Sequence, residues 1–128
     1  MDNPIDRAWP YITACIPLWR ENQLDDALTL LDKGIAELQR LGDCEGIMRL
    51  ARVAGVMCDR DRPARARDYI ELGITNAPED LLLHIHAAYV CRRLGDVEAE
   101  QQHLQSCRSK SSGHPDRDKA LDLLEWYA

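Results

Sequence analysis

The chain has 128 residues, of which 45% are hydrophobic and 30% charged, a composition typical of one globular domain and too apolar for an intrinsically disordered chain. The 22 acidic residues outnumber the 16 basic ones and give a net charge of -6, which argues against nucleic acid as the main ligand because phosphate binding needs a basic face. The sequence shows neither a signal peptide nor an apolar run long enough to cross a bilayer. We therefore expect a single cytoplasmic domain over residues 1–128, with no membrane partner.

Apolar residues recur with a helical period along almost the whole chain, and no segment has the pattern of a strand. The first expected helix covers about residues 9–20 and contains Pro17, which should kink it or end it early. A long apolar stripe over residues 24–41 follows, and Gly42 ends it. Further helices are expected at about residues 45–58, 63–76, 81–94, 97–108 and 116–127. A polar loop at 109–114 precedes the last of them.

The helix pairs repeat one another in sequence. The second pair reads Leu50-x2-Val53-Ala54-x2-Met57, and the third repeats this 34 residues later as His84-x2-Ala87-Ala88-x2-Cys91. The first pair lies 39 residues earlier, as Tyr11-x2-Ala14-Cys15-x2-Leu18. In the second helix of each pair, Ala27, Ala66 and Glu100 take one position, and Leu31, Ile70 and Leu104 follow four residues later. Small residues at these places let two antiparallel helices approach closely.

This spacing resembles the tetratricopeptide repeat (TPR) family, whose pattern is large-x2-Leu-Gly-x2-Tyr, Ala-x3-Phe and Pro. The resemblance covers about residues 8–108 and implies an all-α fold, an α-α superhelix (a TPR-like solenoid) of three antiparallel helix pairs plus a C-terminal capping helix. The repeats would span about 8–41, 44–78 and 79–110, with the capping helix at about 115–128. The extra residues before the second pair look like the longer repeats of some bacterial regulators and signalling proteins. There Gly55 could take the glycine position and move the register by one. An unrelated helical bundle is the alternative.

In TPR proteins the first helices line a concave groove that holds a partner as an extended segment or a helix. The resemblance places this partner-binding groove at Trp9, Ile12, Ile16, Trp19, Arg20, Met48, Leu82, Ile85, Tyr89, Arg92 and Arg93. Subject to the register, Ala51, Gly55, Cys58 and Asp59 complete the second repeat. The Lys and Asn clamp of one TPR class is replaced by Ile12, Ala51 and Ile85. We therefore expect an apolar peptide or helix whose acidic residue pairs with Arg92 or Arg93. Alternatively, Trp9 and Trp19 pack under the first helix, or the last helix covers the groove.

The sequence thus predicts a protein–protein interaction adaptor or chaperone-like module, not an enzyme, with no catalytic residue, cofactor or metal. One alternative is an oligomeric assembly or regulatory subunit of a signalling or transcription complex, with the chain pairing as a homo-oligomer. A second is a metal-binding or catalytic protein that uses its His and Cys residues.

Four further patterns have structural explanations. Five cysteines without a CxxC pair indicate buried thiols in a reducing compartment. His103 and Cys107 could face one metal, but two ligands do not make a zinc site. His84 is expected as a hydrogen-bonded core histidine. The basic run over residues 60–67 is interrupted by Asp59, Asp61 and Asp68 and is expected to be a solvated, salt-bridged turn.

Overall fold

The computed structural model describes residues 6–127, and within this part the chain forms seven α-helices and no strand. The all-α prediction is confirmed, and so are the helix positions, to within a few residues at each end. The helices are α1 (Trp9–Arg20), α2 (Leu24–Leu41), α3 (Cys44–Cys58), α4 (Pro63–Asn76), α5 (Leu81–Arg93), α6 (Val97–Lys110) and α7 (Arg117–Tyr127). No helix among the described residues is long and apolar enough to cross a membrane.

The helix ends follow local capping rules. The side chain of Asp43 accepts a hydrogen bond from the backbone N–H of Gly46 at 3.0 Å, and Asp80 and Asp96 cap α5 and α6 in the same way. Gly42 ends α2 with a φ of 69°, a left-handed conformation that favours glycine. Pro63 is placed at the start of α4, where its missing N–H costs nothing. These signals explain why the boundaries could be read from the sequence.

The first helix covers residues 9–20 as expected. Of the kink or early end expected at Pro17, the early end does not occur, because α1 continues to Arg20. Proline removes the hydrogen bond to the carbonyl of Thr13, and because Thr13 is exposed, water can satisfy that carbonyl instead. The polar loop expected from residue 109 begins later, because α6 runs on to Lys110. The Lys110 ammonium donates a hydrogen bond to the carbonyl of Pro78 at 2.8 Å, which ties this helix end to the turn before α5.

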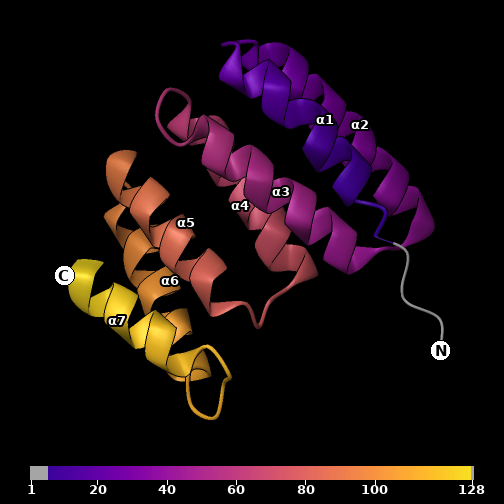
Figure 1. Cartoon of the computed structure of the whole chain (residues 1–128). Helices are drawn as coiled ribbons and strands as arrows, with labels where there is room; N and C mark the ends of the chain where they lie inside the picture. Colours follow the sequence, from indigo (N-terminus) through magenta and orange to yellow (C-terminus); the bar gives the residue numbers. More distant parts are fainter. Residues whose placement is uncertain (1–5, 128) are drawn as a thin grey trace, which may run out of the picture.

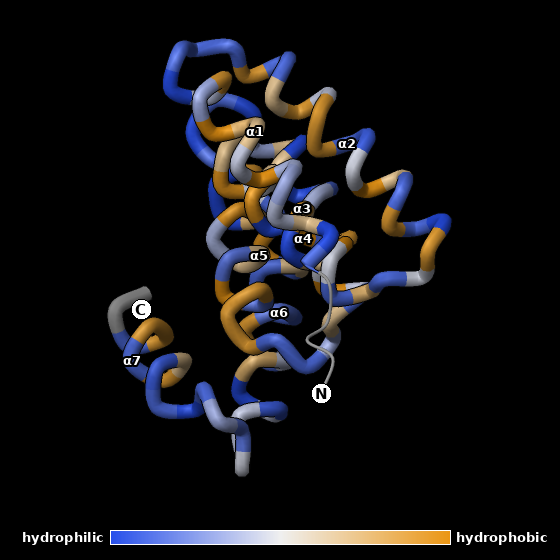
Figure 2. Tube along the Cα trace, turned by 45° about the vertical axis from the view of Figure 1, so that its right-hand side comes forward, coloured by the Kyte–Doolittle hydropathy of each residue, from blue (hydrophilic) through white to orange (hydrophobic). Residues whose placement is uncertain are grey.

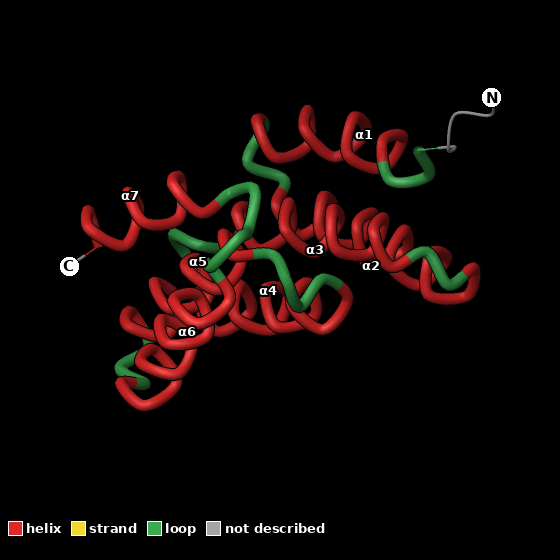
Figure 3. Tube along the Cα trace, turned by 90° about the horizontal axis from the view of Figure 1, so that it is seen from below, coloured by secondary structure: helices red, strands yellow, loops and turns green. Residues whose placement is uncertain are grey.

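The helices pack in sequence, each against the next, and α1 also contacts α3. Figures 1 and 3 show two layers, with α1, α3, α5 and α7 in one and α2, α4 and α6 in the other. Along α2, hydrophobic and hydrophilic residues alternate at helical spacing (Figure 2), as expected for a helix with one face on the core. The last helix lies on α5 and α6.

The core contains the small residues that the repeat pattern placed at helix crossings. Cys15, Ala27, Ala54, Ala66 and Ala88 are all fully buried. The three larger residues expected between successive pairs, Leu31, Ile70 and Leu104, are buried as well. Gly34 of α2 also marks a close approach, because a Cβ built there would lie 2.7 Å from Cγ of Tyr11 and 2.8 Å from Cδ1 of Leu50. Helices α1 and α3 therefore both press against α2 at this point.

Candidate functional site

Among the described residues, large apolar side chains are exposed in both layers, on α1, α3 and α5 and also at Leu41, Leu94 and Val97, and those on α1, α3 and α5 include three aromatic ones. The exposed fraction is 54% for Trp9, 42% for Trp19, 47% for Val56 and 40% for Tyr89. We call these four residues the apolar surface. The alternative in which both indoles pack under the first helix is not what the structure shows. Each of these side chains leaves apolar area in water that another polypeptide could cover.

The residues assigned to the groove divide into three groups by burial. Six are exposed, namely Trp9, Trp19, Arg20, Tyr89, Arg92 and Arg93. Three are half-buried and pack against the core, namely Ile16, Met48 and Leu82. The remaining two, Ile12 and Ile85, are only 8% exposed. These two belong to the core and not to a partner-binding surface.

The last helix explains the burial of Ile85. Leu124 of α7 belongs to the same buried cluster as Ile85, and Leu82 packs against that cluster. Helix α7 thus covers part of the α5 side that the groove prediction left open, in line with one of the alternatives. Tyr89 lies on the same helix and stays exposed.

The exposed stripe of α3 lies one residue later than the first register predicted. Ala51, Gly55 and Cys58 are buried, because α3 is packed between neighbouring helix pairs. Val56 is exposed instead, and Arg49 and Arg52 are half-buried. The burial pattern follows the alternative register in which Gly55 takes the small-residue position.

Charged contacts hold the first helices to one another at the edges of the apolar surface. The Arg49 guanidinium lies 2.6 Å from the Asp6 carboxylate, and its hydrogen bond holds the pKa of Asp6 below the usual range. His86 of α5 lies 2.7 Å from both carboxylate oxygens of Asp59 at the end of α3. Arg52 of α3 pairs with Asp80 at the start of α5. These contacts fix α3 against both neighbours in its layer.

The three arginines assigned to the groove differ in their surroundings. Arg93 donates a hydrogen bond to the carbonyl of Arg60 at 2.9 Å, which positions its guanidinium beside α3. Arg92 lies 4.0 Å from the carboxylate of Glu100. Arg20, at the end of α1 next to Trp19, makes no ion pair with any residue that the structure describes. All three side chains are exposed.

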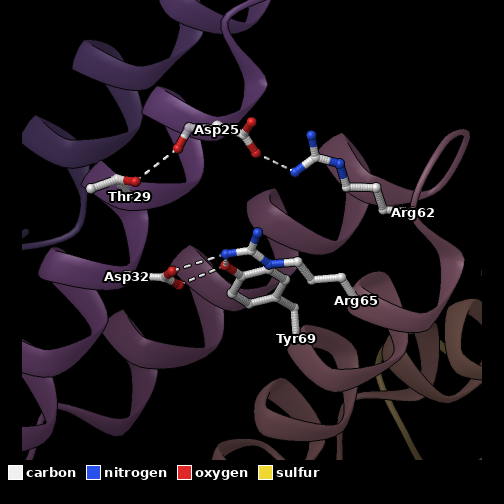
Figure 4. Close-up of polar contacts among 6 residues, drawn as sticks. All are labelled: Asp25, Thr29, Asp32, Arg62, Arg65 and Tyr69. Carbon is white, nitrogen blue, oxygen red and sulfur yellow. Dashed lines mark hydrogen bonds and ion pairs between the residues drawn. The ribbon is translucent and has the colours of Figure 1, made fainter.

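The second layer is held together by a polar cluster between α2 and α4 (Figure 4). The Tyr69 hydroxyl donates to Oδ1 of Asp32 at 2.6 Å, and Arg65 reaches the other oxygen of Asp32 at 3.2 Å. Arg62 pairs with Asp25 at a second point between the same two helices. Burial, followed by the hydrogen bond to Asp32, raises the pKa of Tyr69 to about 12.

The basic run over residues 60–67 forms salt bridges as expected, but they join it to other helices and are not confined to a turn. Arg62 and Arg65 reach across to α2, and Arg67 lies 2.9 Å from Asp96 at the start of α6. The partners are 29 to 37 residues away in sequence, so they belong to neighbouring helix pairs.

A similar contact recurs at the equivalent place between α4 and α6. By the 39- and 34-residue spacings, Asp32 corresponds to Glu71 and Tyr69 corresponds to His103. Nε2 of His103 lies 3.0 Å from Oε1 of Glu71, as the Tyr69 hydroxyl lies beside Asp32. Two neighbouring pairs thus use the same positions to join their second helices.

The contact between Glu71 and His103 belongs to a larger cluster that the sequence did not predict. One ligand atom each from Glu71, Cys91 and His103 lie within 4.8 Å of one another. Nδ1 of His103 lies 3.4 Å from Nδ1 of His84, whose Nε2 lies 3.2 Å from the carbonyl of Pro78. The hydrogen-bonded core role expected for His84 is confirmed. Burial lowers the pKa of His84 and raises that of the Cys91 thiol.

The sequence offered a weak signal for this cluster. His103 takes the position of Tyr69, and in the register that α3 follows His84 takes that of Ala51, so the third pair carries two imidazoles where the second has none. Spacing within one helix instead suggested Cys107 as the partner of His103. Cys107 is buried in an apolar cluster with Leu104. Of the five thiols, Cys44 alone is exposed, and the other four are buried as expected.

Comparisons with protein-family models, curated proteins and solved structures find no match to this chain. The geometry of the chain itself is therefore the basis for assigning a function.

Proposed function

We propose that the protein is a binding module, an adaptor or chaperone-like protein that takes an apolar segment of a partner on the surface of its first helices. The observation that carries this proposal is the exposure of Trp9, Trp19 and Tyr89. Each half-exposed indole leaves on the order of 100 Å² of apolar area in water, and covering it would contribute about 2–3 kcal/mol. Tryptophan, tyrosine and arginine are the residue types most enriched at the energetic centres of protein interfaces.

The proposed architecture is a TPR-like stack of three helix pairs closed by α7. The sequence spacing, the two layers, and the equivalent contacts Asp32–Tyr69 and Glu71–His103 support it. Ion pairs between neighbouring first helices hold the supporting layer in place, so the exposed aromatic side chains project from a fixed base. A preorganised surface loses less conformational entropy on binding than a flexible one.

The proposed partner is an extended or helical segment with apolar side chains and at least one carboxylate. Trp9 and Trp19 stand ten residues apart on α1, about 15 Å along the helix axis, so the segment would cover two anchoring points. Arg20 is exposed beside Trp19, and a carboxylate there would gain a charge-assisted hydrogen bond. Arg92 and Arg93 offer the same chemistry next to Tyr89. We place this activity in the cytoplasm, a compartment in which the free thiols would stay reduced.

A random linear peptide library displayed on phage tests the proposal, because it samples many candidate segments at once. Panning on the wild-type protein should enrich peptides with aromatic or aliphatic residues and an Asp or Glu. Fluorescence anisotropy then gives the affinity of a synthetic copy. The double variant Trp19→Ala/Tyr89→Ala should weaken that affinity at least tenfold, since such anchors dominate binding energy.

The control is Val97→Ala on α6, where the exposed fraction of the side chain is 65% and the helix belongs to the other layer. This variant should bind the peptide as the wild type does. Circular dichroism establishes that each variant is folded. Failure to enrich any peptide, or equal binding by the double variant, would contradict the proposal. Sedimentation of the free protein shows whether a second copy of the chain occupies the surface instead.

A further inference from the structure

The cluster of Glu71, Cys91, His84 and His103 lies between α4, α5 and α6, away from the apolar surface. Cys91 is fully buried, His84 is 4% exposed, and the His103 and Glu71 side chains are 14% and 44% exposed. The cluster thus runs from the interior of the third helix pair to solvent between α4 and α6. A small solute could reach it from the Glu71 side.

The hydrogen bonds in this cluster determine where the imidazole protons lie. The Pro78 carbonyl can only accept, so Nε2 of His84 carries a proton and donates to it. Nδ1 of the buried, neutral His84 is therefore an acceptor, and Nδ1 of His103 donates to it. Nε2 of His103 is then the nitrogen that faces the Glu71 carboxylate, at 3.0 Å. A proton or a metal ion has to link these two atoms, because a carboxylate oxygen can only accept.

The linking cation could be a proton or a metal ion. The position of the Cys91 sulfur beside the other two donors favours the metal ion. Its sulfur belongs to the same group of ligand atoms, within 4.8 Å of the Glu71 and His103 donors. A proton shared by His103 and Glu71 needs no third donor. A borderline-soft divalent metal prefers such a set of imidazole nitrogen, thiolate sulfur and carboxylate oxygen. In a tetrahedral zinc site these atoms lie roughly 3.2–3.7 Å apart, so the donors would have to approach one another by at most about 1.6 Å.

We propose that Glu71, Cys91 and His103 form a binding site for a divalent transition metal of the zinc class. The fourth position faces solvent between α4 and α6. His84 is a positioning residue, because it accepts the other ring N–H of His103 and is itself anchored on the Pro78 carbonyl. Metal-bound histidines generally have such a hydrogen-bond partner on the second nitrogen.

The third pair differs from the second at two of the cluster positions. In the register that α3 follows, Ala51 and Cys58 take the positions of His84 and Cys91, and Tyr69 takes that of His103. The second pair therefore has a buried thiol at the equivalent place but no imidazole beside it. The third pair adds two imidazoles next to the thiol, and both contribute to the same cluster.

Titration of the chelator-treated, full-length protein with Zn²⁺ tests the site. Competition with a chromophoric chelator should give one tight site per chain. Cys91→Ser, His103→Gln and Glu71→Gln should each weaken it at least tenfold. His84→Leu, which removes the supporting imidazole, should weaken it about tenfold to a hundredfold, the range seen when such supporting residues are lost. Cys44→Ser and Cys107→Ala, which remove thiols outside the cluster, should leave the affinity unchanged.

Cobalt gives a readout that depends on no variant. Co²⁺ added to the wild-type protein should produce the visible bands of a tetrahedral site and a thiolate-to-metal charge-transfer band. The charge-transfer band should remain in Cys44→Ser and disappear in Cys91→Ser. Absence of these bands in the wild type would overturn the proposal. So would Zn²⁺ binding that is lost in Cys44→Ser and retained in Cys91→Ser. Neither outcome bears on peptide binding, which uses the exposed side chains of Trp9, Trp19 and Tyr89 and none of the proposed ligands.

Discussion

Removing one hydroxyl from Tyr69 tests whether the first two helix pairs are joined as described. The hydroxyl donates to Asp32 of α2 at 2.6 Å, and the residue is only 7% exposed (Figure 4). Tyr69→Phe keeps the ring and deletes the hydrogen bond, so it measures the link between α2 and α4 with little change in packing.

The expected loss follows from the chemistry of the pair. A hydrogen bond to a charged acceptor contributes about 1.5–3 kcal/mol, and the lower end applies because Asp32, half exposed, regains water when the hydroxyl is lost. We expect the free energy of unfolding to fall by about 1–2 kcal/mol. For a domain of this size that corresponds to a decrease in Tm of about 4–7 °C.

The assay is thermal and urea unfolding followed by circular dichroism at neutral pH. Tyr89→Phe is the matched control, because Tyr89 is exposed and its hydroxyl makes no hydrogen bond with the described residues. It should change stability by less than about 0.5 kcal/mol. In a double-mutant cycle, Tyr69→Phe and Asp32→Asn should be coupled by about 1 kcal/mol.

The pH dependence of the same variant has a definite sign. The pKa of Tyr69 is raised from 10.0 to about 12, so folding favours the neutral phenol. Its stabilisation is fully present below a pH of about 10 and is lost as the pH rises from about 10 to about 12. The stability gap between wild type and Tyr69→Phe should therefore narrow over that interval. If Tyr69→Phe unfolds like Tyr89→Phe at neutral pH, the link between α2 and α4 is not formed as described.

Two further predictions test the packing of α2 and the capping of α5. Gly34→Ala should destabilise the protein by about 1–2 kcal/mol despite better helix propensity, because the new Cβ would lie 2.7 Å from Cγ of Tyr11. The matched variant Gly73→Ala, whose new Cβ has its nearest contact at 3.4 Å, should be neutral or stabilise the protein by up to about 1 kcal/mol. Urea unfolding of both variants checks this, and equal effects would contradict it. Asp80→Ala, which removes both the cap of α5 and the partner of Arg52, should cost about 1–2 kcal/mol. Asp80→Asn keeps the cap and should cost less in the same assay. A larger loss of stability in Asp80→Asn than in Asp80→Ala would refute this explanation.

The positions of the helices could be predicted from the sequence because the signals that start and end a helix are local. The period of apolar residues, Gly42 and Pro63 act within a few residues of where they stand, and the structure places the helix ends there. The small residues at the crossings could also be predicted, since a repeated spacing identifies equivalent positions. The early end at Pro17 was wrong because an exposed proline interrupts only one hydrogen bond.

The surface and the polar cluster depended on contacts between distant parts of the chain. The burial of Ile85 results from α7, some 40 residues further on, and no pattern within α5 indicates it. The register of α3 was ambiguous by one residue, which moved the exposed position to Val56. Ligating residues were sought at helical spacing, so His103 was paired with Cys107 and its neighbour Cys91 on another helix was missed. Such pairings depend on how the helices stack.

The central claim is that the first helices present exposed aromatic side chains to a partner, and nuclear magnetic resonance tests it most directly. Chemical shifts of the ¹⁵N-labelled protein are followed while a selected peptide is added. The claim predicts shifts at the indole N–H groups of Trp9 and Trp19 and at amides around Tyr89, with amides of α2, α4 and α6 little changed. Perturbations confined to the second-layer helices, with both indole signals unmoved at saturating peptide, would contradict it.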